Sequence, residues 1–131
     1  MPAKSKSKEE IEKVQETLKD IKTKQGIIGY ILRGPNSASI DLKDPTKIID
    51  YAILSATAFE AGQDIPNTFE IGKVDDIILE GEDMKVLSMT IGDNRLSIFM
   101  EKNVDHNKLC DILKVEFDNR GLRSASCHLR K

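Results

Sequence analysis

Hydrophobic residues near the start of this 131-residue chain recur at helical spacing. The apolar positions of this first segment are Ile11, Val14, Leu18 and Ile21. Steps of three and four residues place them on one face of an amphipathic helix. Ser7 and Glu10 have the spacing of a capping box, and Gly26 supplies the left-handed residue that commonly follows a helix. The pattern therefore predicts a helix that begins at Ser7 and stops before Gly26.

The apolar pattern then changes to one that is typical of strands. Residues 27–32, "IIGYIL", are apolar on both faces, which predicts a strand that is covered on both sides. After the turn "GPNS", residues 38–43 form a shorter second strand. Three more strands are predicted at 73–80, 84–91 and 95–100, and the turns "GED" and "GDN" join them into a meander. The first strand of the meander mixes charged and apolar residues, as edge strands often do.

A second helix is predicted between the two groups of strands. Asp44 favours an N-cap and Pro45 a first helical position, while Gly62 is the expected stop. The apolar positions between them are Ile48, Ile49, Ala52, Ile53, Ala56 and Phe59. This face is wider than a surface helix needs to cover one sheet. Two interpretations follow: a helix well buried in the core, or a helix of which one part meets a second subunit.

The end of the chain contains one more predicted helix. It begins near Asp105, carries apolar residues on one side and stops at "DNRG". Residues 122–131 have no periodicity and are expected to be a tail, and residues 1–6 a flexible N-terminal segment. A single domain is thus predicted over residues 7–121.

Composition and charge narrow the classes of function. Hydrophobic residues make up 39% and charged residues 32%, as in a globular domain with a well-solvated surface. The net charge of −2 argues against nucleic acid as the main ligand. No apolar run is long enough for stable insertion into a membrane, and the start lacks the apolar region of a secretory signal, so we expect a cytoplasmic protein.

Residues with obvious chemistry are few. Cys127 and His128 are adjacent ligand types without a second pair, so no metal site is predicted, and no disulfide framework is expected from two cysteines. The chain contains no GxxxxGK[ST] and no GxGxxG segment. His106 has no evident base to serve, and the carboxylates of the meander lie on an edge strand and a turn. We therefore predict a non-enzymatic protein with no catalytic residues and no cofactor.

Three segments together resemble the roadblock family of dynein light chains and small-GTPase regulators. They are "GIIGYIL" after the first helix, "IIDYAILSATAFEAG" in the second, and "FEIGKVDDIILEGEDMKVLSMTIGDNRLSIFM". The last is similar to the family pattern of Leu-Gly, Leu-Glu-Gly and Gly-Asp landmarks, here Ile71-Gly72, Glu80-Gly81 and Gly92-Asp93. The first hairpin departs from the family, because "RGPNSA" replaces the usual D-x-x-G turn.

The resemblance implies an α+β, profilin-like fold of order α-β-β-α-β-β-β-α. In it a five-stranded antiparallel sheet lies between one central helix and two terminal helices. It also implies a dimer, of two identical chains or with a paralogous roadblock protein, in which the third strands pair edge to edge and the second helices lie together. The residues implied for the paired edge are Lys73, Val74, Asp76, Ile78 and Glu80. Those implied for the dimer helix and partner platform are Ile48, Tyr51, Ala52, Ser55, Ala58, Phe59 and Glu60.

The function implied is that of an interaction module, a binding platform or regulator for a Ras-like or Rag-like small GTPase. Tyr51 is the expected anchor for the partner, because aromatic side chains give a large contact area with few rotors to freeze. The alternatives are a dynein-type cargo adaptor and a monomeric sensor of a small ligand. A sensor cavity needs convergent polar groups, and the second helix offers chiefly Ser55 and Thr57.

Overall fold

The computed structural model of the chain describes residues 2–35, 38–69, 76–91 and 94–119. In chain order the elements are α1 (Pro2–Lys22), β1 (Ile27–Arg33), β2 (Ala38–Leu42), the short 3-10 helix η1 (Pro45–Lys47), α2 (Ile48–Phe69), β3 (Asp76–Glu80), β4 (Met84–Ile91), β5 (Asn94–Glu101) and α3 (His106–Asn119). The order of helices and strands is the predicted one. The departures concern where α1 begins, where α2 ends and which way α2 faces.

The strands form one antiparallel sheet in the order β2-β1-β5-β4-β3. The hairpin β1–β2 and the meander β3–β4–β5 join where β1 pairs with β5. The predicted α+β class and five-stranded antiparallel sheet are confirmed. Strands β1, β5 and β4 lie inside the sheet, which explains why the sequence of β1 is apolar on both faces. Strands β2 and β3 are its two edges.

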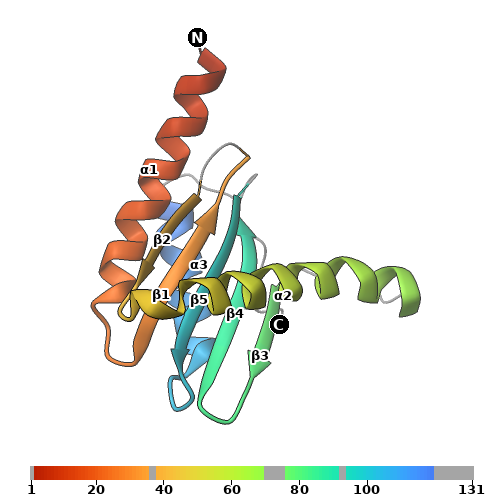
Figure 1. Ribbon diagram of the computed structural model, residues 1–131. Coiled ribbons are helices and arrows are strands. Elements are labelled where there is room, and N and C mark those ends of the chain that lie inside the picture. The colour runs from red at the N-terminus through yellow and green to blue at the C-terminus, as the bar shows by residue number, and fades with distance from the viewer. Residues whose placement is uncertain (1, 36–37, 70–75, 92–93, 120–131) are drawn as a thin grey trace.

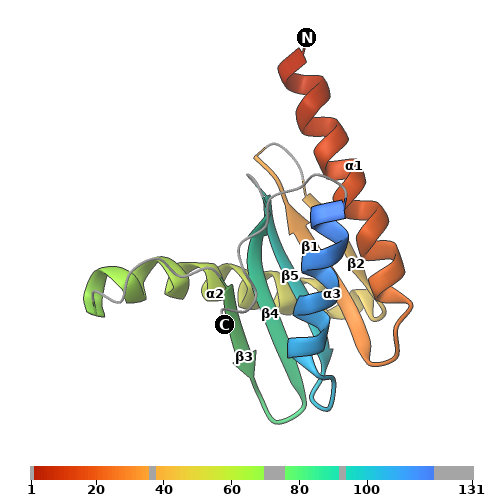
Figure 2. The same ribbon diagram turned by 180° about the vertical axis from the view of Figure 1, so that it is seen from behind.

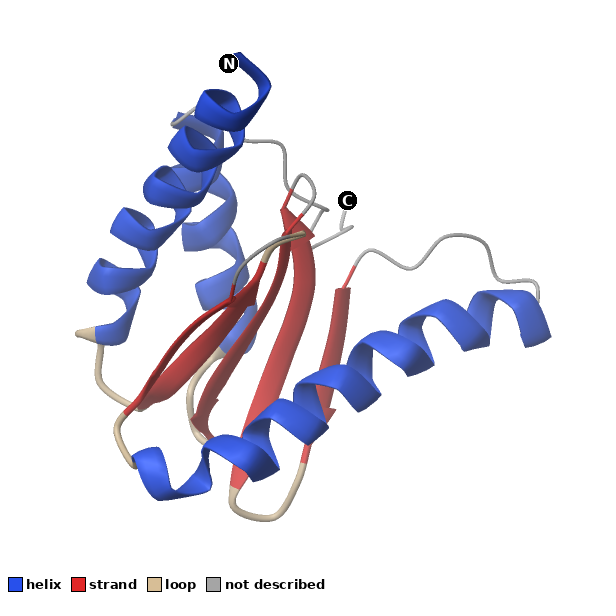
Figure 3. Cartoon of the chain, turned by 45° about the horizontal axis from the view of Figure 1, so that its top comes forward, coloured by secondary structure: helices blue, strands red, loops and turns tan. Residues whose placement is uncertain are grey.

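Helices cover both faces of the sheet. In Figure 1, α2 crosses the near face, and in Figure 2, which shows the sheet from behind, α1 and α3 lie side by side on the far face. Figure 3 shows the same three layers, with the sheet between α2 and the pair of terminal helices. Helix α1 is tied to the edge strand β2, since Gln15 donates to the Ser39 hydroxyl (2.6 Å) and Lys22 forms an ion pair with Asp41.

The main hydrophobic core lies between the sheet and the terminal helices. Alternate residues of β1, β4 and β5 point into it, as the two-residue period of a strand requires. Its buried members are Val14, Leu18, Ile21, Ile27, Tyr30, Leu32, Leu87, Met89, Ile91, Leu96, Ile98, Met100, Leu109, Cys110, Leu113 and Phe117. The opposite face carries a smaller cluster, Ile31, Leu42, Val86 and Phe99, with half-buried residues of α2 against it.

The first helix begins earlier than its sequence predicts. It starts at Pro2 and passes through Ser7, so the predicted capping-box start is wrong as a boundary. Proline is tolerated at the first helical position, because its missing N–H would have no partner in the helix there. No proline or glycine interrupts the residues between Pro2 and Ser7, and nothing in the local sequence therefore stops the helix from extending.

The second helix continues beyond its predicted stop. Asp44 is the N-cap, as expected, and its carboxylate accepts from the Thr46 backbone N–H (3.1 Å). However, the helix runs through Gly62 to Phe69. A Cβ at Gly62 would lie 2.8 Å from Cδ1 of Ile77 on β3, so the glycine allows close approach of helix and strand instead of ending the helix.

The remaining boundaries agree with the sequence where they are described. Helix α3 starts directly after Asp105, whose carboxylate accepts from the backbone N–H groups of Asn107 (3.1 Å) and Lys108 (3.2 Å). Gly26 has the positive φ, +90°, expected after the first helix. Of the predicted strand 73–80, the structure describes 76–80, and Lys73, Val74 and the predicted tail 122–131 lie outside the described residues.

Candidate functional site: the α2 face and the β3 edge

Helix α2 is fixed to the sheet at its centre by three hydroxyl groups. Ser55 of α2 lies 2.7 Å from Ser97 of β5, and Ser97 lies 3.1 Å from Ser88 of β4, measured between the Oγ atoms. All three side chains are buried. A buried hydroxyl without a partner is costly, so this chain of hydrogen bonds favours one position of α2 across the sheet. Sequence periodicity did not identify it, because isolated serines in a strand usually face solvent.

Two stacked aromatic rings hold α2 to the sheet one helical turn before Ser55. The ring of Tyr51 lies over Phe99 of β5, with 4.6 Å between centroids and 14° between planes. Tyr51 is half-buried by this contact with its own sheet. The ring that the sequence predicts as a partner anchor therefore also packs within its own chain.

A row of exposed residues runs along the side of α2 that faces away from the sheet. We call Ile49, Ile53, Ala56 and Glu60 the outer stripe; they are separated by four, three and four residues and share one helix face. Ile49 is 73% exposed and Ile53 61% exposed. In the single chain, the two isoleucines of the outer stripe therefore expose apolar surface to solvent. Such patches commonly mark contacts with other proteins.

The neighbouring edge strand, β3, is also incompletely covered. It pairs with β4 on one side only, in the register Ile78 to Leu87. None of its residues is fully buried, although Ile77, Ile78 and Leu79 are apolar. An edge strand with exposed backbone groups and partly exposed apolar side chains is a template for pairing with another strand.

Helix α2 extends past this edge. Gly62 contacts Ile77 of β3, and the residues of α2 that follow lie beyond the last strand of the sheet. Figures 1 and 3 show this part of the helix projecting away from the sheet. Within the residues that the structure describes, no layer of the chain lies beneath this part of the helix. The projecting segment and the uncovered β3 edge lie at the same side of the molecule.

The structure redistributes the residues that the sequence predicted for the platform. Glu60 is exposed, and Ile48, Tyr51, Ala52 and Phe59 are half-buried. Ser55 and Ala58 are buried against the chain's own sheet, so in this position of α2 they offer little surface to a partner. Ile49 and Ile53, which the sequence placed on the broad apolar face, are large apolar residues of α2 that are exposed. On the edge, Asp76 and Ile78 are half-buried and Glu80 is exposed.

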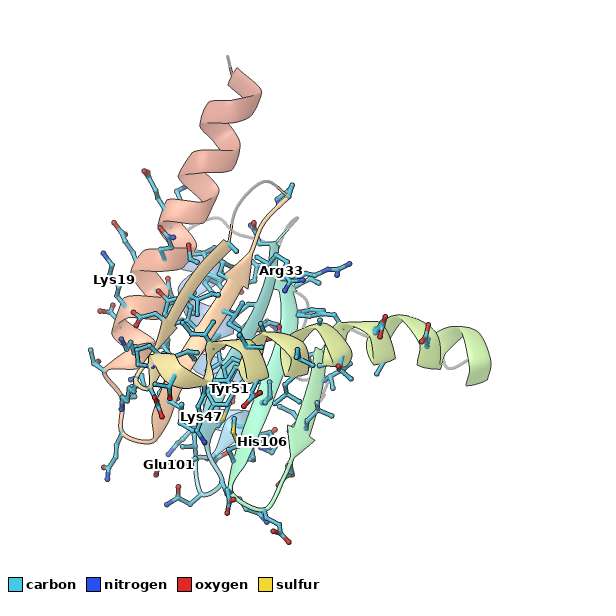
Figure 4. The ribbon with its side chains drawn as sticks, viewed as in Figure 1. Lys19, Arg33, Lys47, Tyr51, Glu101 and His106 are labelled. Carbon is cyan, nitrogen blue, oxygen red and sulfur yellow. The ribbon has the colours of Figure 1, made fainter. Side chains whose placement is uncertain are left out.

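A hollow and several polar contacts lie on the side of the sheet that carries α1 and α3. A hollow of about 390 Å³ is lined by Lys24, Gln25, Gly26, Ile27, Glu101, Asn103, Val104, Asp105, Lys108, Leu109 and Ile112. Beside it, the buried Lys85 ammonium donates to the Val104 carbonyl and lies 3.0 Å from Nδ1 of His106, a residue labelled in Figure 4. On the α1 side, burial and the charge of Asp41 raise the pKa of Tyr30. The contacts of Lys85 join β4 to α3 and to the loop before it.

The described residues contain neither a metal-binding cluster nor a helix that could cross a membrane. In the parts of the chain that the structure describes, no three His, Cys, Asp or Glu side chains gather in an arrangement that could hold a metal ion. Among these same residues, no helix combines the length and the apolar character that crossing a membrane requires.

Solved structures identify the fold. The chain is similar to a roadblock/LC7 domain from Streptomyces avermitilis, with a TM-score of 0.61 and 13% identity over 80% of this chain and 88% of that one. It is also similar to the gliding protein MglB from Thermus thermophilus, with a TM-score of 0.56 and 16% identity over 82% of each chain. No family model matches the sequence, and no curated protein matches it. The chain thus has the roadblock fold, as its sequence landmarks predicted, although its identity to these two structures is low.

Proposed function

We propose that this protein is a dimeric interaction module that acts as a binding platform or regulator for a Ras-like small GTPase. The observation that carries the proposal is the incomplete cover on one side of the molecule. Among the described residues, no layer of the chain covers the outer edge of β3 or the part of α2 beyond it. A second copy related by a two-fold axis would pair β3 with β3 and bring the two α2 helices together, so one contact would cover both features.

The outer stripe is then available for a different partner. In such a dimer two copies of Ile49 and Ile53 would line one broad surface on the α2 side, with Glu60 at its rim. Apolar centres with charged rims are typical of protein interfaces. The resemblance to roadblock regulators supports a Ras-like GTPase as the class of partner, and the similarity in fold to a roadblock/LC7 domain agrees with it.

The proposal is tested by titrating the Ras-like GTPases of the source cell, each loaded with GDP or a non-hydrolysable GTP analogue, onto the immobilised protein. We expect one GTPase to bind in a nucleotide-dependent way. Ile53→Asp should weaken this binding by about tenfold or more, because it places a charge in the apolar centre. The matched control is Val115→Asp on α3, an exposed apolar residue remote from α2.

Two results would contradict the proposal. One is the absence of binding by every GTPase in both nucleotide states. The other is binding that Val115→Asp weakens as much as Ile53→Asp does. Because Ile53 is exposed, Ile53→Asp should fold normally, and a melting curve establishes this before the titration.

A further inference from the structure

A row of four exposed side chains crosses the sheet beside α2. Strand pairing places Arg33 of β1 opposite Ala38 of β2 on one side and opposite Arg95 of β5 on the other, and Arg95 is opposite Thr90 of β4. All four are exposed. We call them the arginine row. Arg95 is two residues from Ser97, which faces α2, so the row lies on the α2 face of the sheet. Figure 4 shows Arg33 beyond α2, toward one end of the sheet.

The arginine row borders the outer stripe. The guanidinium carbon of Arg95 lies over the ring of Phe59 of α2, 5.4 Å from its centroid. Going around the helix, Phe59 lies between Ser55, which faces the sheet, and the exposed residues Ala56 and Glu60. A partner that covers the outer stripe therefore meets Arg95 next. The arginine row therefore continues the surface of the outer stripe from α2 onto the neighbouring strands.

The pair of arginines is unfavourable for the isolated chain. Like charges directly opposite each other on adjacent strands destabilise a sheet, and strands lie only about 4.8 Å apart. Within the described residues, no acidic side chain forms an ion pair with either arginine; the ion pair found there joins Lys22 and Asp41. The contact with Phe59 holds the Arg95 guanidinium in place without neutralising it. Positive charge is thus concentrated on a chain whose net charge is −2.

We propose that Arg33 and Arg95 bind a pair of carboxylates on the protein that docks on the outer stripe. The planar guanidinium forms paired hydrogen bonds with a carboxylate, and two of them side by side select a segment with two acidic residues on one face. Thr90 adds a hydroxyl at the end of the row. The identity of the partner rests on the proposed function, whereas the preference for carboxylates rests on the row alone.

The test uses fluorescein-labelled hexaglutamate as the probe, with fluorescence anisotropy at low salt on the full-length protein. We expect binding to the native protein that falls about tenfold or more in the double variant Arg33→Gln/Arg95→Gln, because two charge-assisted contacts are lost. The control is Lys19→Gln/Lys43→Gln, which removes the same charge from exposed residues of other parts of the surface. It should weaken binding by less than about twofold. Hexaglutamine, which has the same backbone without the charges, should not bind.

A second readout separates recognition from folding. Removing one member of a like-charged pair should leave the melting temperature of Arg33→Gln unchanged or raise it. The proposal is overturned if hexaglutamate does not bind, if both double variants weaken it equally, or if inorganic phosphate displaces it more effectively than glutamate at equal concentration. If hexaglutamate binds at the row but no GTPase binds the protein, the proposed function fails and the carboxylate site stands. If a GTPase binds but hexaglutamate does not, only the carboxylate site fails.

Discussion

The two faces of the sheet differ in how completely a single chain covers them. On the α1 and α3 face, side chains such as Leu96, Ile98 and Phe117 are fully buried. On the α2 face, Phe99 and Ser55 are buried, but Tyr51 and several other α2 residues against the sheet are only half-buried, and Ile53 on the outer side is largely exposed. The α1 and α3 face is thus well covered by residues of the same chain. The other carries exposed apolar residues that, under the proposed function, a partner would cover.

The largest effect of a substitution is expected on the α1 and α3 face. Leu96→Ala removes buried methyl groups from the main core and should lower the free energy of unfolding by about 3 kcal/mol. Chemical denaturation at two protein concentrations measures the loss, which should be the same at both, because this core is complete in each chain. A loss below about 1 kcal/mol would show that the core is less tightly packed than the described contacts indicate.

A smaller loss is expected for the aromatic contact on the α2 face. Tyr51→Ala removes the ring that stacks on Phe99 and should cost about 2 kcal/mol, less than for a fully buried aromatic residue. Tyr51→Phe keeps the ring and serves as the control. Thermal unfolding of the two variants should differ clearly. Equal stability of the alanine and phenylalanine variants would mean that the stack does not hold α2.

The buried serines should behave as one unit. Ser97→Ala leaves Ser55 and Ser88 without their common partner and should cost about 1 kcal/mol. The triple variant, with alanine at all three positions, leaves no buried hydroxyl without a partner and should lose less than the three single variants added together. Denaturant unfolding of the four variants gives the comparison. Additive losses would show that the hydroxyls act independently.

The smallest effect is expected at Asp44, the N-cap of η1, which leads into α2. Hydrogen bonds from the Thr46 side chain and backbone lower the pKa of Asp44. The folded state therefore favours the ionised carboxylate. This contribution is present above the unfolded pKa, about 3.9, and is lost as the pH falls through the lower folded value. Asp44→Ala should lower the melting temperature at neutral pH but have progressively less effect below about pH 4. An effect independent of pH would contradict this origin.

The sequence predicted the element order well because strand periods and turn residues are local signals. The bounds of the meander strand 84–91 agree with the structure to the residue, and α3 begins close to the predicted Asp105. Gly62 misled the prediction, because its small size serves a tertiary contact with Ile77 that no local pattern records. A glycine at the end of an apolar run has the same local appearance in both roles.

The orientation of α2 could not be predicted for a related reason. Its sequence has apolar or small residues on most sides, so the pattern does not single out the face that meets the sheet. Ser55, a polar residue, turned out to face inward, while Ile49 and Ile53 face outward. The hydroxyl partners on β4 and β5 decide this, and they lie more than 30 residues away in the chain. The arginine row likewise depends on strand register, which places Arg33 beside Arg95.

We propose that a second copy of the chain covers the β3 edge and the projecting part of α2. Sedimentation equilibrium of the native protein over a micromolar concentration range tests this dimer most directly. We expect a species of about twice the chain mass of 14.7 kDa, which dissociates on dilution. A single species of 14.7 kDa at every concentration would contradict it.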